Sequence, residues 1–172
     1  MPPADHRAAR LATRLAFLVA GFGMACWAPL VPFAKQRLAV DDGVLGLLLL
    51  CLGVGSVVAM LLTGVLSARY GSRPIIIGGG VGLAIVLPLL SIVATPFTLG
   101  LALLGFGAAL GSIDVAMNIH AVEVEHASDQ PLMSGFHAQF SIGGFAGSAL
   151  MTVLLAMQAG AFISTLVCTA LM

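Results

Sequence analysis

The stretch from Gly43 to Ala68 reads GVLGLLLLCLGVGSVVAMLLTGVLSA and contains no Asp, Glu, Lys, Arg or His. Three further stretches lack these five residue types, over residues 15–34, 74–113 and 138–172. A helix needs about 20 apolar residues to cross a bilayer, whereas the strands of a membrane barrel alternate apolar and polar residues. The unbroken runs therefore predict an all-α membrane protein.

The composition of the whole chain agrees with this prediction. Of 172 residues, 60% are hydrophobic and only 8% are charged, and the mean hydropathy is +1.12. A soluble domain carries about 25% charged residues. The net charge of zero also removes the electrostatic attraction that a nucleic acid partner requires. A disordered chain, a nucleic-acid-binding protein and a disulfide-rich secreted domain are therefore excluded.

The apolar runs divide into six expected helices. The first two runs hold one helix each, and the longer third and fourth runs hold two each, with turns at Pro96 and at Gln158–Gly160. After a tail over residues 1–12, we expect helices over residues 13–35, 44–67, 74–94, 97–121, 132–157 and 160–172. The sixth is shorter than the roughly 20 residues of a span, which predicts an incomplete helix in a truncated chain.

The basic residues predict how the chain is oriented in the membrane. They occur in or next to the N-terminal tail and the first two connections: Arg7, Arg10, Arg14, Lys35, Arg37, Arg69 and Arg73. With the N-terminus in the cytoplasm, five of them lie inside and two outside, as the positive-inside rule requires. The apolar stretch after the tail is too long for the core of a signal peptide. We therefore expect a multi-pass protein of the inner (plasma) membrane with a cytoplasmic N-terminus.

Cysteine and glycine indicate packing rather than chemistry. Cys26, Cys51 and Cys168 all fall within apolar runs and show no metal-ligand spacing, so we expect inert buried thiols. Small residues let membrane helices approach closely. Glycines recur at helical spacing at Gly107 and Gly111, at Gly143 and Gly147, and along one face at Gly46, Gly53 and Gly64. They favour tight packing within one bundle over formation of a homodimer.

Asp114 is an ionisable residue in an otherwise apolar helix, and Asn118 lies one turn later on the same face. Such residues are costly in a membrane and usually face a cavity or a partner. Two interpretations stay open. Asp114 either lines a substrate path, where it could respond to protons, or lies near the interface and pairs with Arg69 or Arg73.

His137 in the fifth helix, with Ser141 one turn later, also has two interpretations. It could titrate near neutral pH and couple transport to protons, but a hydrogen bond between helices is the favoured interpretation. Glu123 and His126 show the Glu-x-x-His spacing of half a di-iron site within an expected charged connection. Because such a site needs two copies and further Glu residues, we expect no metal and no cofactor. Enzyme motifs are also missing, so an enzyme is not supported.

Residues 64–74 read GVLSARYGSRP and resemble the cytoplasmic loop signature of the major facilitator superfamily. The positions that match are Gly64, Leu66, Arg69, Gly71 and Arg73. Ala68 stands where the family has an Asp that joins a charge cluster latching the two halves of the transporter. The resemblance therefore implies the fold of the family, with that latch altered.

A longer string resembles one branch of this superfamily, which includes MosC-like and sugar-permease-like bacterial proteins. It comprises GSIDVAMN at residues 111–118, Val122 with Glu123, and MSGFHA at residues 133–138. The resemblance implies functional positions at Asp114, Asn118, Glu123 and His137. On the first helix, Trp27 lies beside Pro29 and Pro32, and the proline pair predicts a broken or kinked helix near a gate.

The resemblance covers the chain as the N-terminal six-helix half of a secondary transporter. It implies alternating access around a midplane site, a small polar solute such as a sugar or a related organic compound, and coupling to protons. The partners would be the lipid bilayer, the solute and a C-terminal six-helix half. The alternative is a small membrane subunit that does not transport, or an inactive fragment that needs a partner half.

Overall fold

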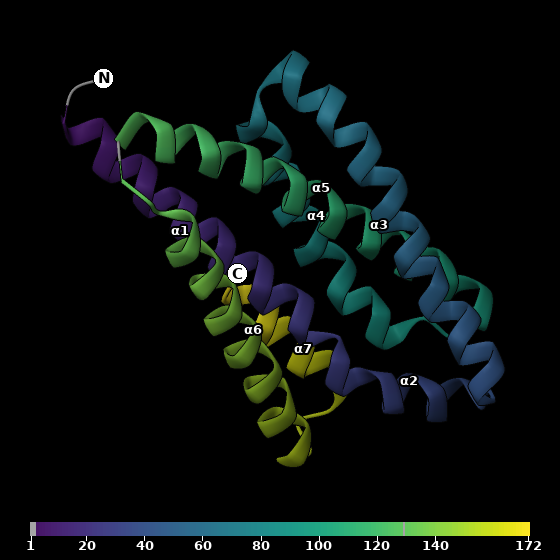
Figure 1. Cartoon of the computed structure of the whole chain (residues 1–172). Helices are drawn as coiled ribbons and strands as arrows, with labels where there is room; N and C mark the ends of the chain where they lie inside the picture. The colour runs from purple at the N-terminus through teal and green to yellow at the C-terminus, as the bar shows by residue number, and fades with distance from the viewer. Residues whose placement is uncertain (1–2, 129) are drawn as a thin grey trace.

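The computed structural model describes residues 3–128 and 130–172, and every regular element in these two ranges is a helix. In chain order they are α1 (Pro3–Cys26), the 3₁₀ turn η1 (Ala28–Leu30), α2 (Val31–Leu38), α3 (Asp42–Tyr70), α4 (Ser72–Ile92), α5 (Pro96–Ser128), α6 (Met133–Ala156) and α7 (Ala161–Ala170). Figure 1 shows α1 lying beside α6, with α3, α4 and α5 grouped next to them. The all-α membrane architecture expected from the sequence is confirmed.

The first expected helix is interrupted where the prolines lie. α1 ends at Cys26, one 3₁₀ turn follows at Ala28–Leu30, and the short α2 continues from Val31. Pro29 and Pro32 cannot donate a backbone hydrogen bond, so the regular helical ladder is lost around them. The break predicted from the proline pair is therefore confirmed.

The fourth expected helix is longer than the sequence indicated. It begins at Pro96 and runs for 33 residues to Ser128, a length of about 50 Å. The segment from Glu123 to His126, which we expected in a connection, instead forms the last turns of α5. The sequence prediction ended this helix near the end of the apolar run. Polar and apolar residues alternate beyond that point, so the continuation of the helix to Ser128 was not predicted.

The turns between helices follow local chemistry. The side chain of Asp41 caps α3 by accepting a hydrogen bond from the backbone N–H of Val44 at 2.8 Å. Gly71, between α3 and α4, has φ +81°, and Gly160, before α7, has φ +78°. Only glycine takes these values without strain. The turns predicted at Pro96 and at Gln158–Gly160 are present.

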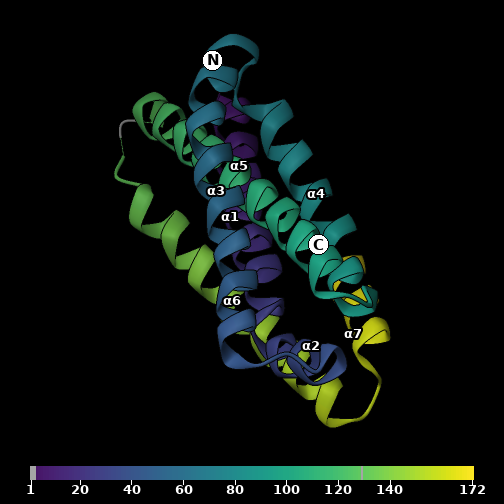
Figure 2. The same ribbon diagram turned by 90° about the vertical axis from the view of Figure 1, so that its right-hand side faces the viewer.

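Two pairs of helices pack with their backbones in contact, α3 with α5 and α1 with α6 (Figure 2). A side chain at Gly107 of α5 would collide with the carbonyl of Leu52 in α3, and one at Gly143 of α6 would collide with the carbonyl of Leu18 in α1. The tight packing predicted from the glycine spacing is therefore confirmed for these helices.

The glycine face proposed for α3 is the wrong one. A methyl group added at Gly46, Gly53 or Gly64 would meet no atom within 4 Å, whereas Gly55 packs directly against the carbonyl of Leu104 in α5. The sequence pattern could not distinguish the two faces, because α3 is apolar all round and glycines occur on both of them.

Some of the apolar side chains are buried in a core, and others lie on the outer surface of the bundle. Phe17, Phe106, Leu103 and Met151 are at most 1% exposed and lie in one core. Large apolar side chains such as Phe145 remain open on the outside, which suits contact with lipid. Five segments in the described residues are long and apolar enough to span a membrane: Arg7–Leu38, Asp42–Tyr70, Ser72–Ile92, Pro96–Ser128 and Met133–Ala156.

Candidate functional site

A polar pair lies on α5 within the apolar bundle. The side-chain amide of Asn118 donates to the backbone carbonyl of Asp114 at 2.8 Å and approaches the Asp114 carboxylate oxygen Oδ1 at 3.5 Å. Both side chains are half-buried. The helical spacing predicted that they would share a face, and the hydrogen bonds confirm it. A carboxylate and an amide are therefore held side by side with free hydrogen-bonding capacity.

His137 is an exposed residue of α6 that packs against an aromatic ring of α1. Its ring meets the ring of Phe17 from α1 edge-on, with centroids 5.3 Å apart, and Phe17 also stacks on Phe136 at 5.7 Å. No ion pair or hydrogen bond joins His137 to Asp114 among the described residues, and the link between them is the electrostatic influence of the imidazole on the carboxylate. We call Asp114, Asn118 and His137 the polar cluster. Its first two members belong to α5 and its third to α6.

The pairing considered for Asp114 with a basic loop residue is absent. The ion pairs among the described residues join Lys35 to Asp42 and His120 to Glu123. Neither Arg69 nor Arg73 forms an ion pair with Asp114 among the described residues. This geometry favours the interpretation in which the carboxylate lies on an inner wall of the bundle.

Glu123 lies outside the polar cluster. It is two and a half turns beyond Asp114 on α5, about 13 Å along the helix axis. Its carboxylate lies 3.5 Å from the ring nitrogen Nδ1 of His120, one turn back on the same helix. The structure therefore separates Glu123 from the other candidate residues.

Glu125 has a structural role that the sequence did not reveal. Its carboxylate oxygen Oε2 accepts hydrogen bonds from the backbone N–H groups of Leu132, at 2.6 Å, and Met133, at 2.7 Å. These donors lie at the start of α6, so one side chain joins the end of α5 to the beginning of the next helix. No local pattern signals this, because the carboxylate and its donors are separated by a connection.

Trp27 is placed in the interior rather than on an open wall. It is 5% exposed and belongs to the core around η1. Its indole N–H is buried, and no hydrogen-bond acceptor lies within reach among the described residues. The structure does not bring Trp27 into the polar cluster.

The residues of the loop signature surround the turn between α3 and α4. Gly71 makes the turn, and the guanidinium of Arg69 lies over the ring of Tyr70, 5.3 Å from its centroid. Arg69, Arg73, Gly64 and Leu66 are all exposed. These residues therefore form a surface of the turn, well separated along the chain from the polar cluster.

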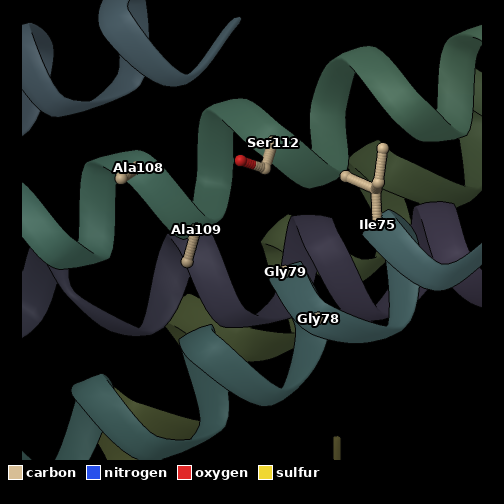
Figure 3. Close-up of a pocket in the computed structure, with 6 residues that line it drawn as sticks. All are labelled: Ile75, Gly78, Gly79, Ala108, Ala109 and Ser112. Atoms are coloured by element: carbon tan, nitrogen blue, oxygen red, sulfur yellow. The ribbon is translucent and has the colours of Figure 1, made fainter. Parts of the chain in front are cut away.

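Two open surface pockets lie where α4 meets its neighbours. One of about 310 Å³ at the crossing of α4 and α5 is lined by Ile75, Gly78, Gly79, Ala108, Ala109 and Ser112 (Figure 3). A groove of about 480 Å³ runs between α1, α4 and α5, with small residues of α1 along one wall and Arg73 and His120 at its edge. Ser112 supplies the polar side chain in the lining of the first pocket. The lining of neither pocket includes Asp114, Asn118 or His137.

Arg37 is a second residue whose role the sequence did not show. Its guanidinium donates to the backbone carbonyls of Leu90, at 2.8 Å, and Ser91, at the end of α4. A positive charge is favourable there, because carbonyl groups at the end of a helix lack partners. Within residues 3–128 and 130–172, no group of three or more His, Cys, Asp or Glu side chains is arranged to hold a metal ion.

Comparison with known proteins places this arrangement in a family. Residues 14–172 match the sequence profile of the Major Facilitator Superfamily. The chain is 58% identical to an MFS-type transporter of Yersinia pestis over 146 residues, which cover 85% of this chain and 38% of that protein.

Two rhizobial proteins are also similar to the chain. The transporter y4wD of Sinorhizobium fredii is 37% identical over 77% of this chain and 35% of its own length. The membrane protein MosC of Rhizobium meliloti is 32% identical over 76% of this chain and 32% of its own length. The chain thus spans about a third of the length of these relatives. No solved structure matches it.

Proposed function

The chain belongs to the major facilitator superfamily, and from this membership we propose that it is the N-terminal bundle of a secondary transporter. The observation that carries the proposal is the polar cluster. A carboxylate and an amide lie side by side on α5, and the imidazole of α6 acts electrostatically on the carboxylate, in a bundle that is otherwise apolar. Ionisable groups within membrane helices mark substrate and proton pathways.

The proposed substrate is a small polar solute, such as a sugar or a related organic compound. Asn118 and Asp114, both half-buried on α5, supply hydrogen-bond donors and acceptors for hydroxyl groups. The proposed driving force is a proton gradient, with Asp114 and His137 as the groups that exchange protons. A C-terminal six-helix half would complete the site, since the relatives are about three times as long as the matched region.

Alternating access would follow from movement of this bundle against the second one. The described bundle is tightly packed, with backbone contacts between α3 and α5 and between α1 and α6. Each of these helix pairs should move as one unit, because close packing at the interface resists bending of either helix alone. The break between α1 and α2 is the place where one helix could change direction without disturbing these pairs.

The proposal predicts how substitutions in the polar cluster alter transport. With this chain joined to its C-terminal half in membrane vesicles, Asp114→Asn and His137→Ala should each remove the pH dependence of solute uptake between about pH 5.5 and 8, a range around the free imidazole pKa. Exchange of labelled for unlabelled solute should continue, because it needs binding but no net proton movement. Uptake would be measured with a panel of radiolabelled sugars under an imposed pH gradient.

Glu123→Gln is the matched control, since its carboxylate lies on α5 but outside the polar cluster. It should leave the pH dependence intact. If the Asp114 and His137 variants retain wild-type uptake across the whole pH range, neither residue couples transport to protons. If no solute is moved by the joined protein while it remains folded in the membrane, the alternative of a non-transporting subunit is favoured.

A further inference from the structure

The groove between α1, α4 and α5 is apolar along its length and cationic at one end. Its volume is about 480 Å³, and four alanines of α1 and two isoleucines of α4 line it. The polar side chains of this lining are those of Arg73 and His120. The start of α1 and the turn at Gly71 lie at the same end of the molecule (Figure 2). Arg73 follows this turn by two residues, and we call its end of the groove the mouth.

Helical spacing explains the apolar part of the groove. Ala8, Ala12 and Ala16 follow one another at intervals of four residues, so they share one face of α1. Their side chains are small and leave space beside the helix, over a length of about 12 Å from the first to the last. The two isoleucines lie one turn after Arg73 on α4. The groove therefore suits an elongated apolar group with a charged end at the mouth.

The mouth offers a positive charge. The side chain of Arg73 is exposed, and it forms no ion pair with any side chain that the structure describes. His120 is half-buried, and its ring nitrogen Nδ1 lies 3.5 Å from the carboxylate of Glu123. The imidazole thus already has an anionic neighbour, which makes Arg73 the group with which an anionic ligand pairs.

We propose that this groove binds one anionic phospholipid, with an acyl chain along the alanines and the phosphate on Arg73. Basic pockets between membrane helices bind anionic headgroups at the bilayer surface. Arg73 is the second residue of the apolar segment Ser72–Ile92, which is long enough to span a membrane, so it lies near the level of the headgroups. The proposal concerns this surface and does not depend on the transport function.

Both parts of a phospholipid contribute to the fit. An arginine pairs with a phosphate through two parallel hydrogen bonds, and an acyl chain gains free energy by covering the apolar side chains. A free phosphate ion would use only the mouth. An apolar helix lying in the groove would leave the guanidinium of Arg73 without an anionic partner, so the charge favours a lipid as the occupant.

The test measures which lipid the purified chain retains. The chain is placed in nanodiscs of phosphatidylcholine and phosphatidylglycerol in equal parts and released for native mass spectrometry. The unaltered chain should retain one phosphatidylglycerol in preference to phosphatidylcholine. Arg73→Gln should lower this retention about fivefold, which is the contribution of one arginine near a membrane surface. Inorganic phosphate should not displace the lipid.

Two matched pairs of variants separate the groove from the general surface. Arg14→Gln removes the same charge, but Arg14 is exposed on the side of α1 opposite to Ala12, so retention should not change. Ala12→Phe should fill the groove and abolish retention although Arg73 is still present. Leu11→Phe is its control, because Leu11 is exposed on α1 outside the lining of the groove.

A photoreactive acyl chain on phosphatidylglycerol locates the lipid without any variant. Its crosslinks should map to residues 8–16 and 73–77 of the unaltered chain, and crosslinks confined to other helices would overturn the proposal. Circular dichroism checks that each variant is folded, and Ala12→Leu replaces Ala12→Phe if helical content falls.

The other occupants of the groove give different results. Equal loss of lipid in Arg73→Gln and Arg14→Gln would mean that general surface charge attracts the headgroup. Displacement by inorganic phosphate would mean that the mouth binds a free anion. A dimer without lipid would identify a second copy of the chain as the occupant. A lipid that is lost when the chain is joined to a C-terminal half would identify a helix. Each of these four results contradicts the proposal.

Discussion

Glu125 shows what a single side chain contributes to the order of this bundle. Its carboxylate holds the backbone N–H groups of Leu132 and Met133, and charge-assisted bonds of this kind are stronger than neutral ones. We predict that Glu125→Ala increases hydrogen exchange at these two amides severalfold. Exchange would be followed by mass spectrometry of the chain in nanodiscs.

Glu123→Ala serves as the comparison, since its carboxylate pairs with the His120 side chain and accepts from neither of these two amides. It should leave exchange at Leu132 and Met133 unchanged. If hydrogen exchange at these amides accelerated equally in both variants, its cause would be the loss of a negative charge and not the loss of the two hydrogen bonds at the start of α6.

At the level of residues, the sequence predicted proximity along a helix but not between helices. Asp114 and Asn118 share a face because they are one turn apart, and this was predictable. The contact of the His137 ring with Phe17 and the attachment of Arg37 to α4 both join distant segments. No periodicity within one helix encodes such contacts, so the candidate site was predicted only in part.

Individual helices are positioned by glycines at their crossings. Gly107 lies where α5 touches the backbone of α3, so an added methyl group would meet the carbonyl of Leu52, which cannot rotate away. We predict that Gly107→Ala destabilises the bundle by about 1–3 kcal/mol, as overpacking usually does. The measurement is the thermal or denaturant unfolding midpoint in detergent.

Gly105→Ala is the matched control, because it lies on the same helix with nothing within 4 Å. Alanine favours a helix over glycine by up to about 1 kcal/mol, so this variant should be neutral or slightly more stable. A loss of stability as large in Gly105→Ala as in Gly107→Ala would show that the crossing is not the cause.

The helices themselves were largely predictable, and their ends were less so. Long apolar runs and the turn residues Pro96 and Gly160 defined most of them. The extension of α5 to Ser128 was missed because polar residues end the apolar run before the helix ends. The packing face of α3 was also misassigned, since Gly46 and Gly55 are indistinguishable in a helix that is apolar on all sides.

Successive long helices run in opposite directions, so the connections between them lie at two opposite ends of the molecule. The N-terminal helix, the turn at Gly71 and the connection after α5 share one end, where Arg10 reaches the side chain of Gln130 at 3.3 Å. The opposite end carries α2 and the turn before α7, and there Arg37 bonds to the end of α4. Five basic residues belong to the first end and two to the second. This asymmetry favours a cytoplasmic position for the first end.

The orientation can be tested with single cysteines in a background in which the three native cysteines are replaced by serine. We predict that Met157→Cys, at the α2 end, reacts with a membrane-impermeant maleimide in intact cells. Arg69→Cys, at the N-terminal end, should react only after permeabilisation. Both side chains are exposed, so a difference in labelling reports the side of the membrane rather than burial. The reverse pattern would place the N-terminus outside, and equal labelling of both positions in intact cells would mean that the few basic residues do not fix one orientation.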